Sequence, residues 1–104
     1  MKYLFLVLFL ISCSSSDKDT RGEAEKLYAE AQELVKADRF ILATEKLNII
    51  KSQHPYSFYA TPAELLQAEV LFKQENYIES AAAFMLFRDF HPRHEKIPYV
   101  VLMI

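Results

Sequence analysis

The sequence contains an internal repeat with a period of 37 residues, and this repeat constrains the fold more than any other feature. At that offset Asp38–Ile41 aligns with Glu75–Ile78, and His54-Pro55 aligns with His91-Pro92. Periods of 20–50 residues are typical of solenoids, in which each unit buries its apolar face against the next. The chain is therefore expected to be a stack of similar units.

Helical signals occur throughout the repeat. Apolar residues recur with a period of 3.6 at Leu27, Ala31, Leu34 and Val35, and again at Phe40, Ala43, Leu47 and Ile50. Thr-x-x-Glu sequences begin at Thr20 and Thr61 and are typical of capping boxes, which satisfy the free N–H groups at the start of a helix. With Pro62 at a first helical position, these signals predict helices over about 20–37, 39–54, 62–75 and 77–91.

Composition excludes the main alternatives to a helical fold. One glycine and four prolines leave little turn chemistry for a small β fold, and a single cysteine excludes an internal disulfide framework. Twelve Lys and Arg against fourteen Asp and Glu give no basic surface for nucleic acid. We therefore expect an all-α protein: an α-solenoid of helical hairpins, with two complete units and the start of a third.

The repeat domain is expected over 20–104, with units at about 20–55 and 61–92 and a truncated unit at 97–104. Pro98 lies 36 residues after Pro62, so the last segment is predicted to start another helix. The rival interpretation is a terminal β-strand of Val, Leu and Ile residues. The helix over 77–90 is apolar nearly all round, which indicates neighbours on several sides.

The first thirteen residues have the features of an export signal. An apolar run, Tyr3–Ile11, follows Met1-Lys2 and is too short to span a bilayer. Leu10–Cys13 resembles the bacterial lipobox, which implies that residues 1–12 are a lipoprotein signal peptide, that Cys13 is acylated, and that 13–19 are a polar tether. The alternative is an ordinary cleaved signal with a nearby thiol. Ser14 after the cysteine implies, by the same resemblance, anchoring in the cell outer membrane at its periplasmic face.

The helical repeat resembles the tetratricopeptide class. That class places small residues where the two helices of a unit cross, and a proline at the end of the second helix. Ala31, Ala43 and Pro55 occupy these positions in the first unit. Ala68, Ser80 and Pro92 occupy them in the second unit.

In tetratricopeptide arrays the first helix of each unit lines a concave groove. The repeat register places seven candidate peptide-binding residues there: Tyr28, Gln32, Lys36, Leu65, Glu69, Phe72 and Lys73. Aromatic and ammonium groups side by side suit an extended peptide that has aromatic side chains and a free carboxylate. The alternative interpretation assigns Val35, Leu65 and Phe72 to the core, with the register shifted by one residue.

The lipobox, the repeats and the joining segment Gln53–Ala60 together resemble the BamD family, lipoproteins of the outer-membrane β-barrel assembly machinery. The stretch 87–100 is similar to that family's passage into its third repeat. The resemblance covers about residues 13–104, the N-terminal portion of a family with roughly five repeats. It implies a scaffold for the assembly and insertion of β-barrel proteins, with BamA-like subunits and unfolded outer-membrane protein precursors as partners.

The remaining patterns do not favour chemistry. His91 and His94 are separated by Pro92 and have no third His or Cys nearby, so a structural role at a helix end, shared with His54, is favoured over a metal site. No acid/base pair and no glycine-rich phosphate loop is evident, so neither an enzyme nor a cofactor is expected. Two alternatives remain: another tetratricopeptide envelope scaffold, for instance in cell division, and the N-terminal part of a lipid-anchored enzyme.

Overall fold

The computed structural model describes residues 19–104, so the predicted signal peptide, Cys13 and most of the tether lie outside the described residues. Five helices make up this range: α2 (Asp19–Lys36), α3 (Phe40–Gln53), α4 (Ala60–Lys73), α5 (Tyr77–Phe90) and α6 (Ile97–Met103). No strand occurs between residues 19 and 104. The predicted all-α fold is confirmed.

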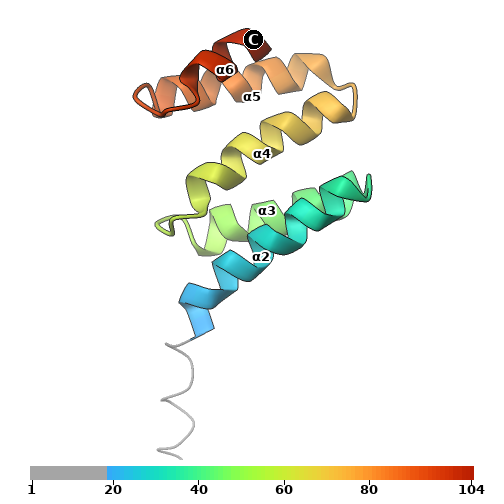
Figure 1. Cartoon of the computed structure of the whole chain (residues 1–104), viewed down its shortest axis with the longest axis vertical. Helices are drawn as coiled ribbons and strands as arrows, with labels where there is room; N and C mark the ends of the chain where they lie inside the picture. The colour runs from blue at the N-terminus through green and yellow to red at the C-terminus, as the bar shows by residue number, and fades with distance from the viewer. Residues whose placement is uncertain (1–18) are drawn as a thin grey trace, which may run out of the picture.

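The helices run alternately in opposite directions and stack along the long axis of the molecule (Figure 1). Each helix packs on its neighbour in sequence: α2 on α3, α3 on α4, α4 on α5, and α5 on α6. Packing between sequence neighbours is the defining property of a solenoid. The two predicted hairpins are therefore α2–α3 and α4–α5, and α6 begins a third.

The turns inside the two hairpins have the same geometry. Asp38 adopts a left-handed conformation with a φ of 58°, and Glu75, 37 residues later, has a φ of 63°. In the first turn the N–H of Asp38 donates to the carbonyl of Val35, and the N–H of Arg39 donates to that of Leu34 (3.1 and 2.8 Å). The second turn repeats both bonds. Each first helix thus ends in a Schellman motif, which satisfies its last carbonyl groups.

Small residues lie where the helices of each hairpin cross, as predicted. Ala31 and Ala43 are fully buried in the first unit, and Ala68 and Ser80 are buried in the second. The Ser80 hydroxyl donates to the Ala68 carbonyl oxygen at 2.8 Å, so the one polar group in this row has a partner. Close backbone approach at these positions lets larger side chains fill the core on either side. These are Leu47 and Ile50 in the first unit, and Phe84 and Phe87 in the second.

The predicted start of α4 is wrong. The helix begins at Ala60, Tyr59 is its N-cap residue, and no side chain makes a capping bond, so Thr61 does not form a capping box. The N–H of Ala60 donates to the Ser57 carbonyl, which leads the chain directly from a turn into the helix. Burial of Ala60 favours this earlier start. Pro62 is then the third helical residue, where its missing N–H still costs no intrahelical bond.

The last segment is helical, which excludes the terminal strand. Pro98 lies in the first turn of α6, and Val100 is buried against α5. We expected α5 to have neighbours on several sides. It packs on α4 and α6, but the rest of its surface is open, because Ile78 and Leu86 are exposed. None of the helices within residues 19–104 combines the length and the apolar character needed to span a bilayer.

Candidate functional site

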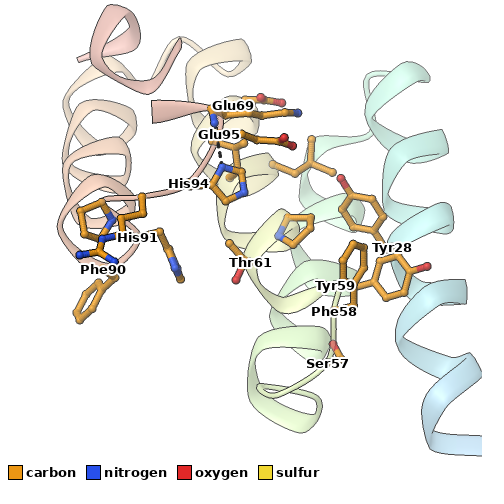
Figure 2. Close-up of a pocket in the computed structure, with 16 residues that line it drawn as sticks. Tyr28, Ser57, Phe58, Tyr59, Thr61, Glu69, Phe90, His91, His94 and Glu95 are labelled. Atoms are coloured by element: carbon orange, nitrogen blue, oxygen red, sulfur yellow. Dashed lines mark hydrogen bonds between the residues drawn. The ribbon is translucent and has the colours of Figure 1, made fainter. Parts of the chain in front are cut away.

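A pocket of about 820 Å³ opens between the two loops that follow α3 and α5 (Figure 2). Its walls come from Tyr28 of α2, the joining segment 57–59, one face of α4, and the loop 90–96. Both loops lie on the same edge of the stack because each hairpin reverses the chain direction (Figure 1). The repeat therefore brings together residues that are more than thirty positions apart in sequence.

One wall of the pocket is aromatic. The rings of Tyr28 and Tyr59 lie 5.6 Å apart, and Phe58 contacts Tyr59 edge-on at 5.5 Å. Figure 2 shows these three side chains as one cluster. Because aromatic rings offer a large apolar surface with defined packing geometry, this wall suits an apolar or aromatic side chain of a ligand.

The opposite wall is charged. Glu69 of α4 lines this part of the pocket together with His94 and Glu95 of the second loop (Figure 2), and Arg93 and Lys96 line it too. The backbone N–H of Lys96 donates to Nδ1 of His94 at 3.1 Å, which orients that imidazole. Carboxylates and cations thus face the aromatic wall across the same space, an arrangement that suits a ligand with both apolar and charged groups.

Glu69 of α4 lines the pocket and influences two tyrosines. Burial raises the pKa of Tyr28, and the negative charge of Glu69 raises it further. Burial also raises the pKa of Tyr99, as do the negative charge of Glu69 and a side-chain hydrogen bond to its carboxylate. One carboxylate of α4 thus lies close enough to tyrosines of α2 and α6 to raise the pKa of both.

The pocket brings together three of the seven predicted groove residues: Tyr28, Leu65 and Glu69. The other four, Gln32, Lys36, Phe72 and Lys73, lie outside its lining. Lys36 is exposed and pairs with Glu33 at 3.2 Å, and Phe72 is 43% exposed with its ring 5.2 Å from that of Tyr77. At 1.5 Å per residue, Lys36 lies about 12 Å beyond Tyr28 along α2. The predicted groove therefore extends past the pocket toward the hairpin turns.

Arg93 and Lys96 line the pocket but were not among the residues predicted from sequence. The signal was present, because the loop 91–96 falls at the same repeat position as the segment 54–59. Equivalent loops of a solenoid lie on one edge, so their side chains share a surface.

His54 and His91 close the two hairpins at equivalent positions. Each is the C-cap residue of its helix, and its backbone N–H donates to a carbonyl of the last turn at 2.8 Å. Nε2 of His91 lies 2.8 Å from the Glu64 carboxylate, and Nε2 of His54 lies 3.5 Å from that of Glu23. Both histidines thus connect the end of a second helix to the start of a first helix. Within residues 19–104, no three His, Cys, Asp or Glu side chains are grouped so as to hold a metal ion.

Comparisons with known proteins agree with this architecture. A family model described as tetratricopeptide repeat matches residues 15–104. The chain is 30% identical over 105 residues to the outer membrane protein assembly factor BamD of Neisseria gonorrhoeae, a match that covers 94% of this chain and 39% of the relative. It is 29% identical over 109 residues to the BamD of Vibrio cholerae, covering 99% of this chain and 45% of that protein. The resemblance expected from sequence is confirmed, and the chain spans about two fifths of the length of these relatives.

Proposed function

The chain belongs to the tetratricopeptide repeat family, and from this premise we propose that it is a non-enzymatic outer-membrane lipoprotein acting in the assembly and insertion of β-barrel proteins. The observation that carries the proposal is the similarity over 94% of the chain to relatives named as outer membrane protein assembly factors. In this role the repeats hold unfolded β-barrel precursors and contact BamA-like subunits. Acylated Cys13 attaches the module to the periplasmic face of the membrane.

The pocket supports a specific mode of peptide binding. An aromatic side chain of an extended peptide packs against Tyr28 and Tyr59, and its main chain continues along α2 and α4. A terminal carboxylate has two cationic sites within reach: Arg93 and Lys96 at the pocket edge, or the lysine pair farther along the groove. We favour Arg93 and Lys96 because they line the same pocket as the aromatic wall.

The test is binding of a peptide that copies an aromatic C-terminal strand of an outer-membrane protein. We expect a Kd on the order of 10 μM, because an extended peptide is ordered as it docks. Reversing the pocket cations in Arg93→Glu/Lys96→Glu is expected to weaken binding more than about tenfold, or roughly 1.4 kcal/mol. The matched control is Lys36→Glu/Lys73→Glu, which reverses two exposed cations outside the pocket. Circular dichroism should show unchanged helicity in both variants.

A modified ligand separates the carboxylate contact from general electrostatics. Amidation of the peptide's C-terminus should weaken binding to the unmodified protein as much as the pocket reversal does. It should not weaken binding to Arg93→Glu/Lys96→Glu further, because the contact is already lost. A loss confined to the control variant would move the carboxylate site to Lys36 and Lys73. Full affinity in both variants would exclude this groove and favour an envelope scaffold with another role.

A further inference from the structure

The segment that joins the two hairpins exposes two aromatic side chains to solvent. Tyr56 is fully exposed and Phe58 is 84% exposed, more than any other aromatic residue between Gly22 and Ile104. Only the edge of Phe58 contacts a neighbouring ring, that of Tyr59. Two exposed aromatic side chains two residues apart at a loop tip form a candidate interaction surface.

The same segment lacks charge. Between Lys51 and Glu64 the only titratable side chain besides Tyr56 and Tyr59 is His54, which is 9% exposed and lies beside Glu23. The equivalent loop one repeat later is different, because Arg93 stands at the position of Tyr56 and is followed by Glu95 and Lys96. Aromatic side chains favour the membrane–water interface, whereas charged groups lose hydration there. The first loop therefore has the chemistry of an interfacial contact, and the second does not.

The position of the loop fits the predicted anchor. The contact between His54 and Glu23, 3.5 Å, places the loop beside the first turns of α2. Glu23 lies four residues after Asp19, or about 6 Å along the helix. Asp19 is the sixth residue after Cys13, and six residues span at most about 20 Å. The start of α2 and this loop both lie toward one edge of the molecule (Figure 1), so a lipid anchor at Cys13 would keep this edge within about 20 Å of the bilayer.

We propose that Tyr56 and Phe58 insert into the headgroup region of the bilayer to which Cys13 is attached. The inference rests on the lipid anchor of the proposed function. The tyrosine ring enters the interface while its hydroxyl stays hydrated, and the phenylalanine ring packs beside the acyl chains. Because Phe58 is also at the rim of the pocket, this contact orients the pocket mouth along the membrane surface.

The chain has no tryptophan and a single cysteine, which allows a direct test. The chain from Cys13 onward is coupled through Cys13 to a maleimide lipid in phosphatidylethanolamine/phosphatidylglycerol vesicles. Tyr56→Trp reports on the loop, and Arg93→Trp is the matched control at the equivalent position one repeat later. We expect the indole emission of Tyr56→Trp to shift to shorter wavelength and to be quenched by brominated acyl chains. The emission of Arg93→Trp should stay unchanged.

A second measurement does not depend on the anchor. For the uncoupled Cys13→Ser chain, Tyr56→Ser/Phe58→Ser should lower the vesicle partition coefficient about tenfold, or roughly 1.4 kcal/mol. Both side chains are exposed, so the helical signal should not change.

Three outcomes would overturn the inference. Equal quenching at positions 56 and 93 would mean that the module lies on the bilayer without using this loop, and no quenching at position 56 would mean that the loop faces away. An emission of Tyr56→Trp that responds to the aromatic peptide but not to lipid would assign the loop to peptide binding. Since the coupling is chemical, none of these results depends on acylation in the cell, which fatty-acid labelling of Cys13 tests separately.

Discussion

Replacing Glu75 by glycine should stabilise the protein, because this residue holds a left-handed conformation with a φ of 63°. A left-handed L-residue costs about 1–2 kcal/mol, owing to the approach of Cβ to the following carbonyl oxygen. Glycine removes that cost but loses about 0.5–1 kcal/mol more backbone entropy on folding. The Glu75 side chain is exposed, so little packing is lost. The net expectation is a gain of about 0.5–1 kcal/mol in the free energy of unfolding.

The assay is thermal unfolding followed by circular dichroism. For a domain of this size, 1 kcal/mol corresponds to a Tm shift of roughly 4–8 °C, so Glu75→Gly should unfold at a Tm about 2–8 °C higher. The preceding residue provides a control, because Gln74 is also exposed but has a φ of −79°. Gln74→Gly should lower the free energy of unfolding by about 0.5–1 kcal/mol. If both variants shift the Tm downward, the left-handed turn is not what limits stability here.

Three further predictions concern the core, the anchor and alkaline pH. Phe84→Ala should lower the free energy of unfolding by about 3–5 kcal/mol in urea titrations, whereas Phe72→Ala, at a 43% exposed position, should cost much less; equal losses would contradict the assigned core. Cys13→Ala should release the protein from the membrane fraction and abolish fatty-acid labelling, and a variant that keeps its label would exclude the lipobox. Burial raises the pKa of Tyr28 and Tyr99 above the ordinary 10.0. Their contribution to stability is therefore fully present below about pH 10 and falls above it, because the unfolded tyrosines lose their protons first. The double variant Tyr28→Phe/Tyr99→Phe should lose less stability above pH 10 than the unmodified protein. An unchanged dependence of stability on pH would assign it to other groups.

The helical hairpins could be predicted from sequence because their determinants are periodic and local. The small residues Ala31 and Ala43 are spaced so that two helices cross closely, and Ala68 and Ser80 repeat that spacing 37 residues later. A pattern that recurs at the same positions in two units indicates a shared structure. The same reasoning predicts that Pro98 lies in the first helix of a third unit and not in a strand.

The start of α4 could not be predicted in this way, because two local preferences compete there. Thr61 followed by Pro62 matches a helix start at residue 62, but the helix begins two residues earlier, at the buried Ala60. A capping bond contributes about 1 kcal/mol, an amount that tertiary packing can outweigh. The capping preference of Thr61 was therefore outweighed by the burial of Ala60. The sequence alone does not reveal that burial.

The pocket also shows which of its lining residues the sequence could not indicate. The candidate residues were taken from the first helices, whereas the charged wall comes from the loop after α5. The two loops occupy equivalent positions, so the fold places them on one edge whatever their sequences are. Their side chains have diverged, with Phe58 and Tyr59 in one loop and Glu95 and Lys96 in the other. The repeat thus determines where the pocket lies, and the differences between the repeats determine the chemistry of its walls.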